Sequence, residues 1–233
     1  MKISNETMAI LSNFANINQN IFIAPGNMIK TKSPASTTVM AIAKVVEEFP
    51  TEVSIYELSK LLNVLNLFDA PDVEFSPAHL TVKQNRSSAN FTYSNKALID
   101  AIMDYDKNIK VVDPELQFTL TDDIFKRIQK SAKLFDVEYV NISSVDGVAR
   151  LVASDAALSK DNANKFTVDI ENPDVYNEDI SVNIKMDALR FIPGDYTVAI
   201  SFIEAGGKRR AICRFNNLTL ETSELEYIVP ADM

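Results

Sequence analysis

Residues 117–135, QFTLTDDIFKRIQKSAKLF, join a strand pattern to a capped amphipathic helix, and this combination indicates the fold class. Residues 117–120 read as a strand, Thr121 stands at the N-cap position, and residues 122–135 are predicted to be helical. At 100° per residue, Lys126, Lys130 and Lys133 point to one side of this helix. The opposite side carries apolar or small residues, which are Ile124, Ile128, Ser131 and Phe135. The helix is therefore expected to pack one face on a sheet and to present a basic face outward.

The same unit, a strand followed by a helix and then by strands with a tight turn, recurs along the chain. The four expected helices span residues 5–15, 56–67, 122–135 and 186–191. Short strands are expected before them at residues 1–3, 52–55, 117–120 and 181–184. Turn signals follow each helix at Pro25-Gly26, Pro77-Ala78, Asp146-Gly147 and Gly206-Gly207. The distances from helix to turn are similar, 15 residues from Leu11 to Gly26 and again from Leu62 to Pro77.

This repeat predicts an α+β fold with two similar domains, each holding two strand–helix–strand units and mostly antiparallel sheets. The N-terminal domain is expected at residues 1–94 and the C-terminal domain at residues 115–233. Residues 95–114, which show no strong period and carry Asp100, Asp104, Asp106 and Asp113, are expected to connect them. A single α+β domain with accidental regularity stays open at this point.

The composition is that of a globular protein, with 46% hydrophobic and 24% charged residues among 233. No run of about 18 apolar residues occurs, so neither a membrane span nor a membrane partner is expected. The N-terminus lacks the apolar region of a signal peptide, and the single Cys213 fits a reducing, cytosolic setting. A net charge of -9 at first argues against nucleic acid as a partner, because phosphate attracts Lys and Arg.

The inventory of chemical groups argues against an enzyme. One His and one Cys are too few for a Cys/His zinc site, and a Ser-His-Asp triad would depend on His79 in a turn. Glycine-rich nucleotide motifs are absent from the sequence, so no cofactor is expected. Three carboxylate pairs, Glu47-Glu48, Asp122-Asp123 and Glu178-Asp179, leave a Mg²⁺ site open. Because Asp122 and Asp123 begin a helix, where acids favour the dipole, we expect neither a metal nor a catalytic site.

The basic residues are concentrated on helices of an acidic chain. Residues 114–233 hold 13 Lys and Arg against 20 Asp and Glu, yet four of the 13 fall within eight positions. The candidates that face outward from the expected helices are Lys60, Lys126, Arg127, Lys130, Lys133, Lys185 and Arg190. A positive strip on an acidic body can contact phosphate weakly, with salt sensitivity and without sequence preference. A merely solvated face remains the alternative, as it does for Lys208-Arg209-Arg210 at a hairpin tip.

In the order of several short stretches along the whole chain, the sequence resembles the DNA polymerase sliding clamps, or processivity factors, of myovirus-type tailed bacteriophages. The resemblance is carried by residues 1–4 (MKIS) with Leu11 and 13–15 (NFA), by 53–58 (VSIYEL), and by 183–186 with 193–196 (PGDY). None of these stretches is a catalytic motif. The resemblance is specific because the stretches occur in the same order over essentially the full length of the chain. The chain departs from the pattern of this family in the first helix, where Asn5 and Ser12 stand at positions that are rich in Lys in the family.

The resemblance implies the DNA-clamp fold and a homotrimeric ring, with antiparallel sheets outside and helices lining the hole. It implies a non-enzymatic function, the sequence-independent encirclement of duplex DNA and the tethering of the replicative DNA polymerase. The seven basic candidates would then face the ring interior. The ring would be placed by an ATP-dependent clamp loader in the cytoplasm of the infected bacterial host cell. Some relatives also serve late transcription, and the sequence leaves open whether late-transcription factors are partners here.

The polymerase C-terminal tail is implied to dock in an apolar pocket, which we expect near the connector and the C-terminal segment. The apolar candidates for this pocket are Ile99, Ile102, Tyr227, Ile228 and Val229. Two other functions stay open beside the clamp. One is a β-rich virion or scaffold protein without a DNA role, and the other is a carboxylate-Mg²⁺ phosphodiesterase using Asp122, Asp123 and their neighbours.

Overall fold

The computed structural model describes the chain except for residues 35–38, 100–102, 104–111, 155–163, 176–179 and 206. The chain forms two compact units. The first consists of Met1–Asn108 with Leu220–Leu225, and the second of Ile109–Thr219 with Glu226–Met233. The division between Asn108 and Ile109 falls within the segment 95–114 that the sequence suggests as a connector. Within the described residues, no helix is long and apolar enough to cross a membrane.

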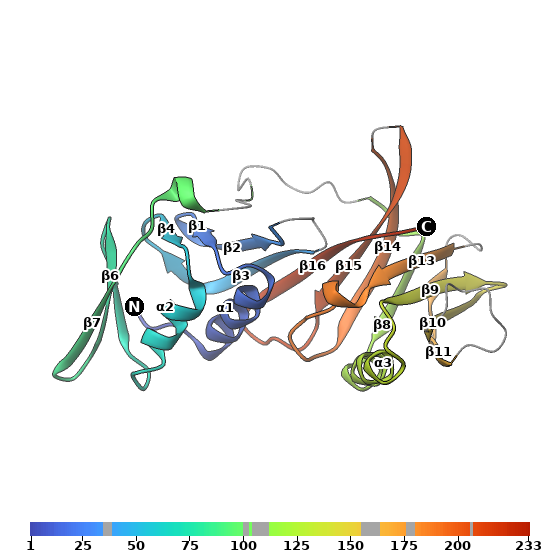
Figure 1. The fold of residues 1–233 in the computed structure, drawn as a ribbon, viewed down its shortest axis with the longest axis horizontal. Coiled ribbons are helices and arrows are strands. Elements are labelled where there is room, and N and C mark those ends of the chain that lie inside the picture. Colours follow the sequence, from blue (N-terminus) through green and yellow to red (C-terminus); the bar gives the residue numbers. More distant parts are fainter. Residues whose placement is uncertain (35–38, 100–102, 104–111, 155–163, 176–179, 206) are drawn as a thin grey trace. The chain divides into compact units, whose positions relative to one another are not determined.

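The first unit consists of two helices and short antiparallel strands (Figure 1). Its elements are α1 (Asn5–Ile17), β1 (Ile21–Ile23), β2 (Gly26–Lys32), β3 (Met40–Phe49), β4 (Val53–Ile55), α2 (Leu58–Leu65), β5 (Asp72–Phe75), β6 (His79–Gln84), β7 (Ser87–Thr92) and the 3₁₀ turn η1 (Lys96–Leu98). Strand β1 pairs with β4, β2 with β3, and β6 with both β5 and β7, all antiparallel. The two helices pack against each other, and each buries apolar side chains, such as Phe14 in α1 and Leu58 in α2.

Helix α1 begins at a well-formed cap. Ser4 accepts a hydrogen bond from the N–H of Thr7 through its hydroxyl oxygen, at 3.2 Å. The buried carboxylate of Glu47 on β3 accepts hydrogen bonds from the Ser4 N–H and from the Thr7 hydroxyl. Glu47 therefore fixes the start of α1 to the strand beneath it, since a buried carboxylate is stable only when its oxygens find donors.

The second unit places one long helix and a 3₁₀ turn against antiparallel sheets (Figure 1). Its elements are β8 (Leu116–Leu120), α3 (Asp122–Phe135), β9 (Tyr139–Val145), β10 (Val148–Ser154), β11 (Lys165–Asp169), β12 (Asp174–Val175), β13 (Ile180–Lys185), η2 (Met186–Ala188), β14 (Tyr196–Ala205), β15 (Lys208–Asn217) and β16 (Glu224–Ala231). One set of strands pairs in the order β12, β8, β14, β15, β16, and another in the order β11, β10, β9, β13.

The hairpin β9–β10 confirms the turn expected at Asp146-Gly147. Asp146 and Gly147 have φ angles of 51° and 75°, and Val145 pairs with Val148 across the turn. Two central residues with positive φ match the right-handed twist of the flanking strands, which is why Asp-Gly is favoured there.

An aromatic cluster fills the core of the second unit. Phe191 stacks on Tyr227 with 4.1 Å between ring centroids, and its ring also lies 4.9 Å from that of Phe215. Tyr196 and Phe125 complete the cluster, with centroids 6.0 Å apart. The cluster joins α3, the segment after η2 and strands β14, β15 and β16 into one packed body.

Several elements differ from the sequence prediction. The helix expected at residues 186–191 is wrong, because only the 3₁₀ turn η2 forms. Leu189 and Phe191 are both buried, and side chains two residues apart cannot share one face of a helix. The strand expected at residues 1–3 reduces to one pair of backbone hydrogen bonds of 2.7 Å between Met1 and Val73.

The second helix is shorter than its expected span of residues 56–67. It begins at Leu58, whose N–H donates to the carbonyl oxygen of Gln19 at 2.8 Å, and it ends at Leu65. Strands β11, β12 and β16 form outside the strands that are expected from the sequence.

Candidate nucleic-acid interface

Helix α3 supplies the strongest candidate site, and its sequence explains its position. Thr121 caps the helix by accepting a hydrogen bond from the Ile124 N–H at 3.4 Å, and Asp136 ends it in the left-handed conformation. The buried face consists of Phe125, Ile128, Ser131 and Ala132. The expected apolar face is thus rotated slightly, because Ile124 and Phe135 are only half-buried.

The opposite side of α3 is basic, as predicted. Lys126, Arg127, Lys130 and Lys133 are all exposed. Two of them pair with acids one turn earlier in the helix, Lys126 with Asp122 and Arg127 with Asp123, the latter at 3.7 Å. Within the described residues, Lys130 and Lys133 make no ion pair, so their ammonium groups are available to an anion.

Beside the basic face of α3 lies a groove of about 750 Å³, which we call the α3 groove. Its floor includes the buried side chains of Ala132 and Leu189. Four cations lie along it, which are Lys126, Lys130, Lys133 and Arg190, together with the acids Asp136 and Asp187. The Gln129 side chain donates to the carbonyl oxygen of Leu189 at 2.8 Å and so joins α3 to the segment after η2.

The structure thus brings four of the seven predicted basic residues together and places three elsewhere. Arg190 forms a 2.5 Å ion pair with Asp187. Lys185 does not line the groove, and its ammonium nitrogen lies 5.9 Å from the centroid of the Tyr139 ring. Arg127 lies over Phe166 at 5.4 Å. Lys60 belongs to the first unit, where it pairs with Glu57 beside a smaller hollow.

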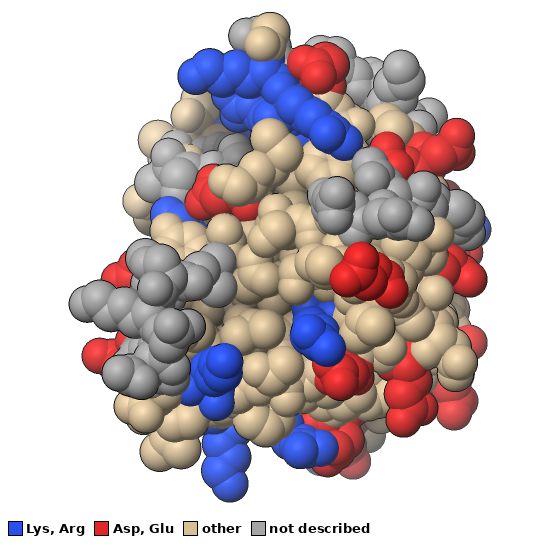
Figure 2. Space-filling view, turned by 90° about the vertical axis from the view of Figure 1, so that its right-hand side faces the viewer, with Lys and Arg blue, Asp and Glu red and all other residues tan. Residues whose placement is uncertain are grey.

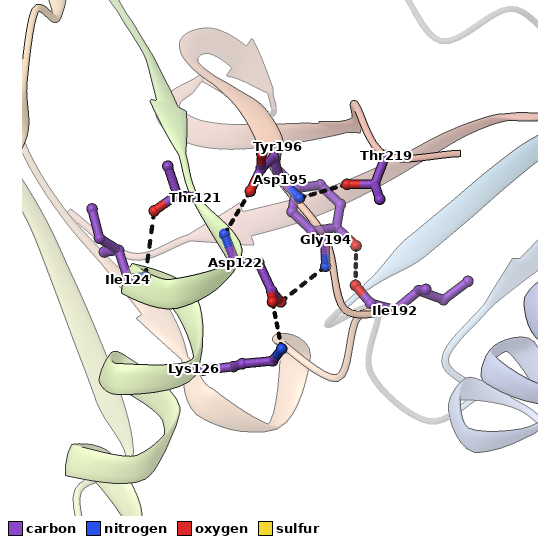
Figure 3. A network of polar contacts seen from close by, with 9 residues as sticks. All are labelled: Thr121, Asp122, Ile124, Lys126, Ile192, Gly194, Asp195, Tyr196 and Thr219. Atoms are coloured by element: carbon purple, nitrogen blue, oxygen red, sulfur yellow. Dashed lines mark hydrogen bonds and ion pairs between the residues drawn. The ribbon is translucent and has the colours of Figure 1, made fainter. Parts of the chain in front are cut away.

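A network of polar contacts fixes the start of α3 to the turn after η2 (Figure 3). Asp195 accepts from the N–H of Asp122 at 2.8 Å, and Asp122 in turn accepts from the N–H of Gly194 at 3.1 Å. The other carboxylate oxygen of Asp122 binds Lys126. Sequence reasoning gave Gln129, Gly194 and Asp195 no role at the site, because their partners are far away in the chain.

This network also gives Asp122 a structural task in place of a metal-binding one. Both of its carboxylate oxygens have partners from the chain itself. In the part of the chain that the structure describes, no group of three or more His, Cys, Asp and Glu side chains could hold a metal ion. The thiol of Cys213 is buried, and burial raises its pKa to about 12, so it remains a protonated core residue.

The expected partner-binding residues lie mainly in the core. Tyr227, Ile228 and Val229 on β16 are at most 1% exposed, so their side chains offer no surface to a partner in the folded chain. Ile99 is also buried, and Ile102 lies outside the described residues. Burial of three consecutive residues is typical of a strand that is covered on both faces. The near-continuous apolar run of β16 could have indicated such a strand.

Comparison with known proteins connects this geometry to one family. The model of the DNA polymerase processivity factor family matches residues 4–104. The chain is 25% identical to the sliding clamp of Vibrio phage KVP40 over 95% of this chain and 96% of the relative. It is 23% identical to that of Escherichia phage RB69, over 98% and 96% of the two chains. A stretch of 76 residues is 38% identical to the sliding clamp of Enterobacteria phage T4 and covers 33% of this chain and 32% of the relative.

Solved structures support the same fold. A. fulgidus PCNA, in complex with the C-terminal region of FEN-1, superposes with a TM-score of 0.66 at 12% identity, covering 97% of this chain and 94% of that one. PCNA from Entamoeba histolytica gives 0.63, with the same identity and coverage. At this identity the likeness establishes the DNA-clamp fold, and the clamps of KVP40 and RB69 match this chain nearly from end to end. The chain is therefore similar to the sliding clamps of phages, and residues 4–104 match the DNA polymerase processivity factor family.

Proposed function

We propose that three copies of the chain close into a ring that encircles duplex DNA and holds the replicative polymerase at the primer end. The observation that carries this proposal is the α3 groove, where Lys126, Lys130, Lys133 and Arg190 gather on a chain of net charge -9. A strip of cations confined to one helix face attracts phosphate there, while the surrounding acid excess weakens attraction elsewhere.

The contact must be weak enough for the ring to move along DNA. Exposed Lys and Arg side chains bind phosphate without reading bases, so each contact can pass to the next phosphate at little cost. Two of the cations in the groove already have carboxylate partners, Lys126 with Asp122 and Arg190 with Asp187, which moderates their attraction. Retention on DNA then depends on closure of the ring, and tethering raises the effective concentration of the polymerase at its substrate.

The two units are proposed to be the two similar clamp domains, with residues 95–114 as their connector. Two domains per chain would give a closed three-chain ring a sixfold pseudo-symmetry. A heterologous contact between copies closes into a ring when its rotation divides a full turn.

The partners are proposed from the family. An ATP-dependent loader would place the ring on DNA in the cytoplasm of the infected bacterial host cell. The C-terminal tail of the polymerase would dock on the clamp, in the way that the C-terminal region of FEN-1 is bound to A. fulgidus PCNA. The same surface would serve late-transcription factors where the phage uses them.

Two measurements test the proposal. Three copies of the 26.0 kDa chain give a ring of about 78 kDa, which sedimentation would detect at micromolar concentration. Clamps loaded on nicked circular DNA should remain at high salt and should leave when the circle is cut. A chain that stays monomeric at all concentrations, or that remains equally long on linear DNA, would contradict encirclement.

The phosphodiesterase alternative makes a separate prediction. It requires cleavage of DNA by the pure chain with Mg²⁺, and a loss of cleavage in Asp123→Asn. The occupied carboxylate of Asp122 favours the clamp, since a metal site there would have to displace the Gly194 and Lys126 contacts. The scaffold alternative predicts no loader-dependent association with DNA.

A further inference from the structure

The end of the β14–β15 hairpin extends beyond the strands that flank it. Strand β8 pairs with β14 only as far as Ile200, and β16 pairs with β15 only from Ala211 onward. Past these points, in the described part of the chain, the two strands pair only with each other, up to Ala205 opposite Lys208. We call residues 202–205 and 207–210 the basic ribbon.

The basic ribbon carries three cations on its second strand. Lys208, Arg209 and Arg210 are exposed, and none of them makes an ion pair with another described residue. Glu204 is the one carboxylate on the ribbon, and it lies opposite Arg209 in the strand register. Three cations against one acid stand out in residues 114–233, where acids outnumber bases by 20 to 13.

The ribbon has two different faces. Strand alternation places Arg209 with Phe202 and Glu204 on one face, and the Arg209 guanidinium lies 4.0 Å from the centroid of the Phe202 ring. The other face carries Lys208 and Arg210 beside the half-buried Ile203. The stacking contact restrains Arg209, so the second face is left with two free cations and an aliphatic side chain.

The ribbon is separate from the α3 groove. Within the second unit, Figure 1 shows the end of the hairpin and α3 on opposite sides of the strands. Figure 2 shows basic side chains gathered at the top of that view, where the hairpin ends. DNA in contact with α3 therefore does not explain the ribbon, and a different ligand is needed.

We propose that the basic ribbon docks an extended acidic segment of a partner protein. Among the described residues, nothing pairs with the β14 side of the ribbon, so its backbone N–H and C=O groups can accept an extended segment as a further strand. Lys208 and Arg210 are two residues apart and point to the same face, so they match acidic side chains at every second position of such a segment. Ile203, which lies opposite Arg210, adds an apolar contact on the same face.

A nucleic acid fits the ribbon less well than an acidic peptide. Affinity for a phosphate backbone grows with the number of cations along its path, and the ribbon offers three before the path meets the acidic body. Nor can a phosphate backbone use a strand edge, because it cannot supply the alternating donors and acceptors of a paired strand. The inference therefore goes beyond DNA encirclement and does not depend on it.

The test uses the full chain and a fluorescein-labelled peptide that alternates Asp and Val over about nine residues, a length typical of a strand. Anisotropy at about 50 mM salt should show binding that weakens at least tenfold at about 0.5 M, because salt screens exposed charges. Lys208→Glu with Arg210→Glu should weaken binding at least tenfold. The matched control is Lys44→Glu with Lys83→Glu, which makes the same change of net charge on exposed residues of the first unit and should bind like the unaltered chain.

Each other outcome overturns the inference. Equal binding by the ribbon variant and the unaltered chain, or equal binding of a peptide with Asn in place of Asp, removes the ribbon as an acidic-peptide site. A single-stranded oligothymidylate that binds through the ribbon while the peptide does not makes nucleic acid the occupant. Lys208→Gln with Arg210→Gln gives the same answer without new repulsion if the Glu variant folds poorly. Because DNA is absent, failure here leaves the test of the ring untouched.

Discussion

The side chain of Asp195 accepts a hydrogen bond from the backbone N–H of Asp122, with 2.8 Å between the two atoms. Asp195 therefore satisfies a donor at the first residue of α3 from outside the helix, a position where a negative charge also favours the helix dipole. The N–H of Asp195 donates to the Thr219 hydroxyl at 2.8 Å, which holds the turn after η2 in place (Figure 3). The start of the basic helix is thus positioned by a residue 73 positions away in the chain.

Replacing Asp195 by Ala should destabilise the chain by about 1–2 kcal/mol, the usual effect of losing a helix cap. The Asp122 N–H would lose its protein acceptor, and the charge near the helix N-terminus would be lost. Urea unfolding followed by circular dichroism measures the change. Asp195→Asn keeps an acceptor oxygen and should recover part of the loss, whereas equal losses in both variants would show that the hydrogen bond is unimportant.

Gly194→Ala should destabilise the chain more than Gly147→Ala does. Both glycines have positive φ angles, 153° and 75°, so either substitution strains the backbone. At residue 194 the added methyl group would also lie 2.6 Å from the Thr219 hydroxyl oxygen, whereas at residue 147 nothing lies within 4 Å. We expect about 1 kcal/mol for Gly147→Ala and at least about 2 kcal/mol for Gly194→Ala, measured by urea unfolding. Equal losses would mean that the contact with Thr219 relaxes freely.

Glu6 should make the stability of the chain depend on pH in the acidic range. Hydrogen bonds from the Thr222 hydroxyl and from the N–H groups of Glu221 and Thr222 lower the pKa of its carboxyl below the ordinary 4.5. A lowered pKa in the folded state stabilises the fold above the unfolded value, and this stabilisation is lost as the pH falls through the folded value.

Glu6→Gln should therefore flatten the fall in unfolding free energy between about pH 5 and pH 3. Urea unfolding at several pH values measures this slope. Glu48→Gln, at an exposed position of β3, is the control and should leave the slope as it is. A slope that is unchanged in Glu6→Gln would show that the loop contacts persist with the protonated acid.

Local signals explain what the sequence could predict. The signals for α3 are the capping Thr121, the 3.6-residue apolar period and the spacing of the Lys residues, and each involves residues only one or two helical turns apart. The helix forms with its basic face outward, as these signals predict. The Asp-Gly turn of β9–β10 is equally local. By contrast, Asp195 and Asp122 are 73 residues apart, and no pattern within either segment indicates that they meet.

The errors of prediction have the same origin. The sequence suggests Tyr227 for an apolar partner pocket because it lies in the C-terminal segment, but the Tyr227 ring stacks on Phe191 in the core. Phe191, the partner in that stack, lies in the span 186–191 that was predicted to be helical, where only the 3₁₀ turn η2 forms. Strand pairing between distant segments decides which apolar residues are buried and which are exposed. The local sequence of each strand indicates this pairing only weakly.

The cations of α3 should contribute unequally to DNA binding, because only some of them have partners within the helix. Lys130 and Lys133 make no ion pair among the described residues, whereas Lys126 and Arg127 pair with Asp122 and Asp123. A cation that binds phosphate releases a counterion from DNA, and the slope of log K against log salt counts these contacts. Lys130→Gln with Lys133→Gln should therefore reduce the magnitude of this slope by about 2.

Lys126→Gln with Arg127→Gln is the matched control, since it removes the same two formal charges from the same helix. In this variant the slope of log K against log salt should change by less than about 1, because the carboxylate of each ion pair competes with phosphate for the cation. Anisotropy of a labelled duplex over a range of low salt concentrations measures both slopes on the free clamp, and sedimentation confirms that the oligomeric state is unchanged. Equal slopes for the two double variants would mean that the intrahelical pairs open without cost and that all four cations contact DNA alike.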